Sequence, residues 1–550
     1  MEIQTMNKLQ QEALKESGTD FTRLGFALFF MIGVLTFSFL SNGGISNNMF
    51  LAIAALIGAY MAMNIGANDV ANNVGPAVGS KAMTMTMAII IAAIFEAAGA
   101  LIAGGEVVKT IKKGIIDISA FGGNPDPFIW AMMAALLAAA LWLNFATMMK
   151  APVSTTHSIV GGVMGAGIAA AGFSIVSWMT MAKIAASWVI SPVLGGLIAA
   201  AFLYSIKKSI VFKEDKVAAA KKWVPVFVAL MSWAFVTYLT LKGLKKIWPN
   251  IVEIINMLPL ISLEVTKKPT LFTALVLGFI VAIVTYIMVK NKLQANTKTL
   301  KNNKASVNTL FTIPLIFAAA LLSFAHGAND VANAIGPLAA INDAVVNGGI
   351  SSKASIPLWV MAVGALGIAL GLALYGPKLI RTVGSEITEL DQIRAFSIAM
   401  AASITVIIAS QLGLPVSSTH IAIGGVFGVG FLREYLHLNK EETSIEENKL
   451  IIQEEEENIS AYMKEKKALE AKEGKGESDY ARIVELYKLI AEENKIIKST
   501  KKDIKRTKKV EYVKRDAVKK IVAAWIITVP AAATLAAVLF FTIKGIMVQG

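Results

Sequence analysis

The chain has 550 residues, of which 55% are hydrophobic and only 16% are charged, and its mean hydropathy is +0.61. Soluble domains carry about a quarter charged residues, so this composition excludes an ordinary soluble protein and indicates a polytopic membrane protein. There is no cysteine, which excludes disulfides and thiolate metal sites. The net charge of +14 is explained by Lys and Arg in cytoplasmic loops rather than by nucleic-acid binding.

Apolar runs of the length that crosses a membrane, about 17 to 25 residues, recur along the whole chain. The first has no small-residue cleavage site, so we interpret it as a retained helix rather than a signal peptide. Segments 153–173 and 416–432 are apolar but rich in Gly, Ser and Thr, and are expected to be spans or hairpins that dip into the membrane. The runs are 24–41, 49–65, 83–103, 128–149, 182–204, 223–241, 270–289, 308–326, 355–375, 395–412 and 521–543.

Two motifs occur twice and in the same order. GANDVANNVGPAVG (66–79) returns as GANDVANAIGPLAA (327–340), and KAPVSTTHSIVGGVMGAGI (150–168) matches GLPVSSTHIAIGGVFGVGF (413–431). A weaker echo relates VKTIKKGIIDI to IRTVGSEITEL. The chain therefore contains a duplicated unit. If both Gly/Ser/Thr-rich segments cross the membrane, the two copies have opposite orientations, which predicts the inverted repeats of secondary transporters.

Each GAND motif is expected to interrupt its helix. Gly66 and Gly327 would end the incoming helix, and the Gly-Pro pairs at 75–76 and 336–337 would start the next one, because Pro is tolerated in a first helical turn. The backbone between them would then be unwound. Free carbonyls and amides survive inside a membrane only where they line a cavity or are buried in protein, so the interruptions predict a binding site.

Asp69 and Asp330 are the predicted cation ligands, because carboxylate, amide and carbonyl oxygens suit alkali and alkaline-earth ions. A single Asp could simply cap a helix at the interface. An ionised Asp at depth costs something like 2.5 to 3.5 kcal/mol, and the repetition of that cost favours a site. The flanking amides are assigned to the cation (Asn68, Asn329) and to the substrate (Asn72, Asn333).

The second motif supplies hydroxyl groups beside helix starts. Free amides at helix N-termini and the dipoles of those helices favour an oxyanion. A cation site and an anion site side by side predict symport. The hydroxyl residues assigned to the anion are Ser154, Thr155, Thr156, Ser417, Ser418 and Thr419.

Three further residues are candidates for coupling. Glu96 lies within an apolar helix, where an ionisable residue is by default functional, although it could be a hydrogen-bonded structural carboxyl. His157 and His420 end the STTH and SSTH motifs. They could carry protons or serve as neutral hydrogen-bond partners at helix starts.

Residues 439–518 form a polar insertion with two Gly, both in EGKGES, and no Pro. Isoleucines recur every seven residues on both sides of EGKGES, which predicts an antiparallel coiled coil with a turn at that point. Its role is either a solvated spacer or the docking of a regulatory partner, and its basic end could bind anionic lipid. The seam residues are Ile445, Ile452, Ile459, Ile483, Ile490, Ile497 and Ile504.

The chain resembles the inorganic phosphate transporter family, which includes sodium/phosphate symporters, proton-coupled phosphate carriers and some sulfate permeases. GANDVANN and GANDVANA are similar to its duplicated signature, PVSTTH and PVSSTH to its second duplicated element, and IFEAAGA with KTIKKGIID to the segment after the first signature. The resemblance covers roughly 49–435 and the last helix. It implies an inverted-repeat fold in which Asp69 and Asp330 serve cation coupling and both Ser/Thr elements help hold phosphate.

Three features depart from the family pattern. The first helix is additional to the usual crossings, the polar insertion precedes the last helix, and Ala399 stands where some sodium-coupled relatives carry a second intramembrane Glu. The last difference leaves sodium and proton coupling open. The predicted organisation is an N-terminal segment with the additional helix (1–48), a first repeat (49–204), linking helices and basic loops (205–307), a second repeat (308–435), a helical hairpin (436–520) and a last helix (521–550).

We therefore expect an all-α, multi-pass protein of the plasma (inner) membrane, with its N-terminus and coiled coil cytoplasmic and its C-terminus outside. Its predicted function is cation-coupled symport of inorganic phosphate by alternating access, with sodium at Asp69 and Asp330 or a proton as coupling ion, no other cofactor and no enzymatic activity. The alternatives are a permease for sulfate or another tetrahedral oxyanion, an intramembrane aspartyl protease with an Asp pair that shares a proton, and a passive anion channel. Expected partners are phosphate and membrane lipid, without nucleic acid, and the sequence also allows a homodimer and a regulatory partner at 439–518.

Overall fold

A computed structural model describes residues 2–45, 48–149, 153–245, 247–257, 266, 268–296, 300–348, 356–386, 390–508, 512–513 and 515–548. Residues 150–152, which open the first Ser/Thr motif, lie outside this set. The described residues form helices and no strand, with one isolated bridge between Ile116 and Val176. In chain order the helices are α1 (Glu2–Ser41), α2 (Asn48–Asn68), α3 (Val70–Gly79), α4 (Met85–Ala103), α5 (Gly105–Lys113), η1 (Ile118–Phe121), α6 (Asp126–Met148), α7 (Thr155–Ala171), η2 (Phe173–Ile175), α8 (Trp178–Ile206), η3 (Lys207–Val211), α9 (Lys216–Tyr238), η4 (Leu239–Gly243), α10 (Trp248–Asn256), α11 (Leu271–Asn296), α12 (Lys304–Thr309), α13 (Thr312–Val346), α14 (Leu358–Glu386), α15 (Gln392–Gln411), α16 (Ser418–Ala471), α17 (Glu477–Lys508) and α18 (Arg515–Val548).

Twelve helical segments of the described chain are long and apolar enough to cross a membrane. Eleven of them coincide with the predicted apolar runs, and the twelfth, Ser418–Asn439, contains most of segment 416–432. Segment 153–173 holds α7, whose 17 residues are at the lower limit for a span. The predicted all-α, multi-pass class is therefore confirmed.

The predicted unwinding at the GAND motifs is wrong. In the second copy α13 continues without a break through Gly327 and Pro337. In the first copy only Asp69 separates α2 from α3, and its N–H still donates to the carbonyl of Ile65 at 2.9 Å. Helical hydrogen bonding satisfies backbone groups that a membrane would leave without water, so the helix start predicted at each Gly-Pro pair does not form.

Close helix crossings explain the two glycines. A Cβ on Gly327 would lie 2.1 Å from the carbonyl oxygen of Glu96, and a Cβ on Gly66 would lie 2.0 Å from that of Ile368. Small residues let transmembrane backbones approach closely. Gly66 and Gly327 therefore bring the two motif helices into backbone contact with α14 and α4, respectively.

These crossings interlock the two copies of the duplicated unit. The motif helix of the first copy packs on α14 of the second, and α13 of the second copy packs on α4 of the first. The Ser/Thr helices show the same exchange, because Gly165 of α7 approaches Ala533 of α18, whereas Gly428 of α16 approaches Gly196 of α8. At these crossings, helices of the first half thus pack on helices of the second half.

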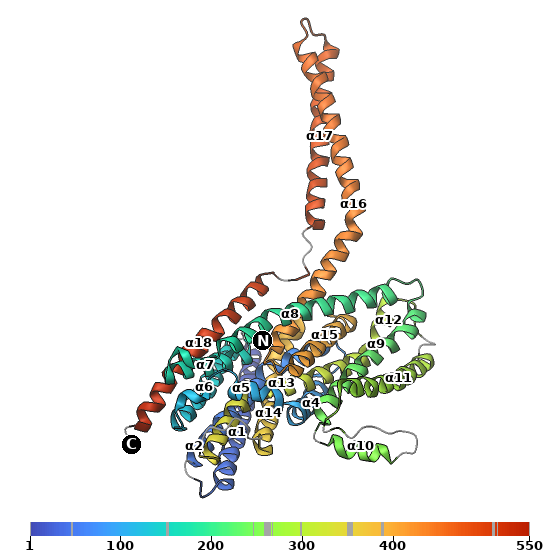
Figure 1. Cartoon of the computed structure of the whole chain (residues 1–550). Coiled ribbons are helices and arrows are strands. Elements are labelled where there is room, and N and C mark those ends of the chain that lie inside the picture. Colours follow the sequence, from blue (N-terminus) through green and yellow to red (C-terminus); the bar gives the residue numbers. More distant parts are fainter. Residues whose placement is uncertain are drawn as a thin grey trace. The chain divides into compact units, whose positions relative to one another are not determined.

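Residues Gly430–Lys514 form a compact unit separate from Met1–Val429 and Arg515–Gly550. Within it the second part of α16 and α17 lie side by side as an antiparallel hairpin (Figure 1). Arg482 pairs with Glu465 at 2.9 Å, and Lys501 pairs with Glu456 at 2.9 Å. The hydrogen bond from Arg482 lowers the pKa of Glu465. Each of the seven seam isoleucines is at least half-buried.

Candidate functional site

Asp69 and Asp330 lie in the interior of the transmembrane unit. Asp69 occupies the junction between α2 and α3, and Asp330 lies in the middle of α13. Their exposed fractions are 1% and 0%. Interfacial helix capping is therefore excluded for both, and each carboxylate needs partners inside the protein.

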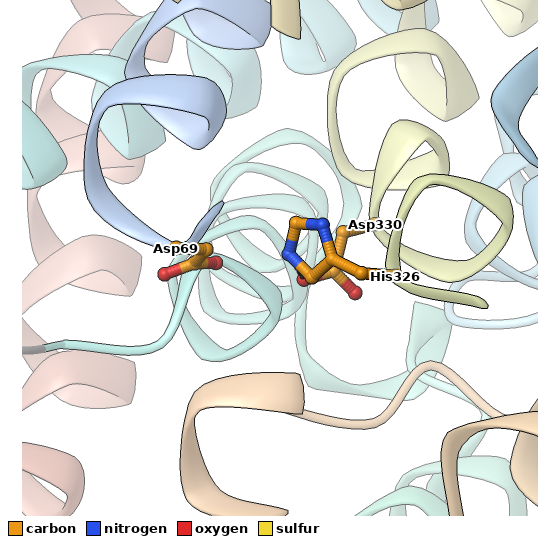
Figure 2. A group of neighbouring side chains, drawn as sticks. All are labelled: Asp69, His326 and Asp330. Carbon is orange, nitrogen blue, oxygen red and sulfur yellow. Dashed lines mark ion pairs between the residues drawn. The ribbon is translucent and has the colours of Figure 1, made fainter. Parts of the chain in front are cut away.

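His326 joins these carboxylates and was not among the predicted site residues. Its Nε2 lies 2.9 Å from Oδ2 of Asp330, one helical turn away on α13. Figure 2 shows His326 and Asp330 together, with Asp69 beside them. One ligand atom from each of the three residues lies within 4.8 Å of the others. The cluster therefore offers two carboxylates and an imidazole to a shared positive charge.

Glu96 extends the cluster on the other side of the imidazole. Its Oε2 lies 2.7 Å from Nδ1 of His326, and its Oε1 accepts a hydrogen bond of 2.8 Å from Asn73. Glu96, His326 and Asp330 thus form a continuous buried chain of polar groups. A buried charge is tolerated only when it is paired and hydrogen-bonded, and this chain meets that requirement for Glu96.

The duplicated sequence has no such chain at the corresponding place. Gly66 meets the backbone of Ile368 as Gly327 meets that of Glu96, so Ile368 is the structural counterpart of Glu96. Ile65 precedes Gly66 as His326 precedes Gly327. The two halves share a backbone arrangement, but one carries an acid and a base where the other carries two isoleucines.

The helix starts predicted for the oxyanion do exist at the Ser/Thr motifs. Ser154 caps α7 by accepting a hydrogen bond of 3.1 Å from the N–H of His157, and Ser417 accepts one of 3.2 Å from the N–H of His420. A serine in this position satisfies one of the free amides of a first turn. Both Ser/Thr motifs therefore begin a helix in the protein interior.

The first hydroxyl of each helix faces the aspartate of its own copy. Thr155 Oγ1 donates to Oδ2 of Asp69 at 2.6 Å, and Ser418 Oγ donates to Oδ2 of Asp330 at 2.9 Å. The structure thus brings together the two motifs that were separately assigned to cation and anion. The same arrangement occurs twice, once in each copy of the duplicated unit.

The second hydroxyl of each helix contacts the other copy. Asn72 Nδ2 donates to Thr419 Oγ1 at 2.9 Å, and Asn333 Nδ2 donates to Thr156 Oγ1 at 3.1 Å. Thr419 also donates to Oδ1 of Asp69 at 3.0 Å. All these side chains are buried, so the site is a continuous polar interface between the two copies.

The remaining predicted residues lie around this interface. Asn68 donates to Thr147 at 2.8 Å, and Asn329 donates to Ser410 at 3.0 Å, so their amide nitrogens are directed away from the carboxylates. Ala399 is buried on α15 and supplies no second carboxylate. His157 and His420 contact each other, with ring centroids 4.5 Å apart.

The cluster places chemical groups suited to a cation beside chemical groups suited to an anion. Carboxylate and hydroxyl oxygens are the ligands of hard cations, while helix N-termini with hydroxyl groups bind oxyanions. Comparison with known families matches residues 65–536 to the phosphate transporter family. The chain belongs to the phosphate transporter family. Its membership confirms the resemblance carried by the motifs.

Similar proteins from the same family extend along most of the chain. A Helicobacter pylori (strain J99) protein whose name proposes a phosphate permease is 49% identical over 554 residues, covering 98% of each chain. A Thermococcus kodakarensis protein with a name of the same meaning is 38% identical over 391 residues, covering 71% of this chain and 91% of its own. A solved structure named "The sodium-dependent phosphate transporter" is 30% identical, with a TM-score of 0.69, covering 90% of this chain and 99% of that one.

Membership of the phosphate transporter family identifies the chain as a multi-pass membrane transporter and not an enzyme. The alternative of an intramembrane aspartyl protease is therefore wrong. His326 and Asn73 are the side chains of the cluster that were missed. His326 precedes Asp330 by four residues, a spacing that places both on one face of a helix. The expectation of an unwound backbone at Gly327 concealed that signal.

Proposed function

We propose that this phosphate transporter is a cation-coupled importer of inorganic phosphate that works by alternating access. The observation that carries the proposal is the paired contact of each buried aspartate with a hydroxyl at the start of a helix. One position thus combines groups for a cation with groups for an oxyanion. The names of the relatives and of the similar solved structure support phosphate and sodium as the two ions.

Electrostatics supplies the reason for coupling. Phosphate would enter beside the carboxylates of Asp69 and Asp330, and like charges in a buried site repel strongly. A cation between them removes that repulsion. Binding of the anion therefore depends on prior binding of the cation.

The hydroxyl groups of Thr155 and Ser418 give a reason why the cation binds before phosphate. A hydroxyl has one O–H to donate, and Thr155 and Ser418 donate theirs to Asp69 and Asp330. When a cation neutralises each carboxylate, the hydroxyl is released and turns to a phosphate oxygen. The free N–H groups of the first turns of α7 and α16 complete the anion site.

The interlocked copies support inverted repeats as the moving parts. Contacts within the site join residues from both copies, as in Asn72 with Thr419 and Asn333 with Thr156. A rotation of one copy against the other would open the site first to one side and then to the other. One net positive charge moved inward through about 100 mV gains about 2.3 kcal/mol, which corresponds to roughly 50-fold accumulation.

We assign the N-terminus and the hairpin Gly430–Lys514 to the cytoplasmic side of a plasma membrane. They are expected on the same side of the membrane as the Lys-rich loops, and loops rich in Lys and Arg are typically cytoplasmic. The chain has no cysteine, so Ser478→Cys introduces a single thiol near the turn of the hairpin. We expect a membrane-impermeant maleimide to label this thiol only after the cells are opened. Labelling of intact cells would show that the hairpin lies outside the cell and would contradict this orientation.

Uptake of radiolabelled phosphate into proteoliposomes tests the function directly. An imposed inward sodium gradient should drive accumulation above the level in vesicles without a gradient, and excess sulfate should not compete. Accumulation driven only by a proton gradient would identify the proton, and not sodium, as the coupling ion. Flux that equilibrates phosphate without any cation gradient would identify a channel, and competition by sulfate would broaden the substrate to tetrahedral oxyanions.

A further inference from the structure

Four aromatic rings form a continuous series of contacts, called the stack, at the Ser/Thr helix starts; the His420 and Trp525 rings are near-parallel, whereas the two histidine rings are nearly perpendicular. The centroid of the His157 ring lies 3.8 Å from that of Trp188 and 4.5 Å from that of His420. The His420 ring stacks on Trp525, with a centroid distance of 3.5 Å. Both histidines are buried, with exposed fractions of 5% and 1%. The stack therefore joins α7 and α16 with α8 and α18.

The duplication relates the two halves of this stack. His157 and His420 occupy equivalent positions in STTH and SSTH, and Trp188 and Trp525 lie on the transmembrane helix that comes next after each Ser/Thr element. When two copies are related by a two-fold rotation, a contact between a residue and its own equivalent lies on the rotation axis. Under the proposed inverted-repeat relation of the copies, the contact between His157 and His420 therefore lies on the rotation axis.

Other contacts in the site are not shared equally by the copies. Thr419 Oγ1 donates to Asp69, whereas its equivalent Thr156 Oγ1 donates to the carbonyl of Val416 at 2.9 Å. If the copies exchange their conformations in the cycle, such a contact breaks on one side and its counterpart forms on the other. A contact on the axis maps onto itself, so the exchange leaves it in place.

We propose that His157 and His420 are positioning residues that form a permanent joint between the two Ser/Thr elements. The joint keeps the starts of α7 and α16 at a constant spacing while the groups around Asp69 and Asp330 exchange partners. This inference rests on the proposed function, because it needs an oxyanion held by both helix starts at once. It assigns the histidines a packing role, in place of proton transfer.

The surroundings of the rings fit a joint rather than a relay. The imidazoles contact indoles and each other through their rings, and no side chain of the described residues hydrogen-bonds to their four ring nitrogens. The histidine that contacts the carboxylates is His326. Trp188 is itself held by a hydrogen bond of 3.2 Å from its Nε1 to the carbonyl of Pro415, which precedes the second Ser/Thr helix. The stack is therefore anchored to both elements.

Substitution of each histidine by phenylalanine distinguishes a packing role from proton transfer, because it keeps an aromatic ring and removes the ring nitrogens. In proteoliposomes containing the full chain, we expect His157→Phe and His420→Phe to keep KM for phosphate within about twofold of the unaltered protein. His157→Ala and His420→Ala should each raise KM by about tenfold, the upper range for an aromatic pair. The double Ala variant should raise KM by less than the product of the two single effects, because both substitutions remove the same His157–His420 contact.

His437→Ala is the matched control, since His437 contacts Tyr512 within the hairpin unit and should leave uptake unchanged. Size-exclusion profiles identify any variant that misfolds. If the Ala variants misfold, the KM values of the Phe variants alone distinguish packing from proton transfer. Phe variants as impaired as the Ala variants would overturn the joint, and so would Ala variants with an unaltered KM. Absence of phosphate uptake by the unaltered protein would instead contradict the proposed function.

Discussion

Asp69→Asn should lower cation-driven phosphate uptake by about 100-fold or more, because removing one partner of a buried charge pair costs about 3 to 5 kcal/mol. The amide keeps the size of the carboxylate, but its single oxygen can replace only one of the two carboxylate oxygens that accept hydrogen bonds from Thr155 and Thr419. The substitution therefore removes the negative charge that attracts the cation, together with one hydrogen-bond acceptor. Initial rates of uptake under an imposed sodium gradient, normalised to reconstituted protein, measure the effect.

Asp117→Asn provides a matched control for this change. Asp117 caps the short helix η1 by accepting a hydrogen bond from the N–H of Ser119, and Asn caps a helix start about as well as Asp. The control should transport at the rate of the unaltered protein. If Asp69→Asn also transports at that rate, Asp69 does not bind the coupling cation.

A triple substitution that copies the apolar half of the protein should fold but fail to transport. Glu96→Ile, His326→Ile and Asn73→Ala install the residues found at the equivalent positions 368, 65 and 334. Gly66 and Gly327 set nearly the same backbone approach in the two halves, at 2.0 and 2.1 Å for an added Cβ, so isoleucine should fit. We expect the thermal unfolding midpoint to be retained and cation-driven uptake to fall by at least about 100-fold.

The single variant His326→Ile is the informative comparison. It leaves the carboxylate of Glu96 buried without its imidazole partner, which should destabilise the protein by about 3 to 5 kcal/mol and lower the unfolding midpoint. Recovery of that midpoint in the triple variant would show that the apolar residues repair the packing. Recovery of transport as well would show that the Glu96–His326 pair is structural and has no part in coupling.

Much of the fold could be predicted because membrane helices must satisfy their own backbone hydrogen bonds within apolar runs. Each predicted run contains a helix, and EGKGES at 473–478 contains the end of the hairpin turn and the start of α17. The duplicated motifs also pointed to Asp69, Asp330 and the two Ser/Thr elements, whose side chains hydrogen-bond to one another in the structure. Pattern and composition were sufficient there because each motif is local.

The interruption of the motif helices was predicted wrongly because glycine has two uses. In isolation Gly66 and Gly327 indicate flexible backbone, whereas in the structure they permit contact with Ile368 and Glu96. No local signal distinguishes these uses, since the neighbouring helix is brought in by residues far along the chain. The same error concealed His326, whose partnership with Asp330 depends on a continuous helix.

From the sequence alone one can infer that this chain is a multi-pass helical protein with a duplicated unit, and that each copy of the repeated GAND motif carries one Asp. These properties follow from hydropathy, periodicity and repetition, which act within one segment at a time. The three-dimensional packing was needed to show that the copies interlock, that Thr155 contacts Asp69 and Ser418 contacts Asp330, and that His326 connects Glu96 to Asp330. Those contacts join residues between 4 and 230 positions apart, and helix packing rather than any local pattern brings the distant ones together.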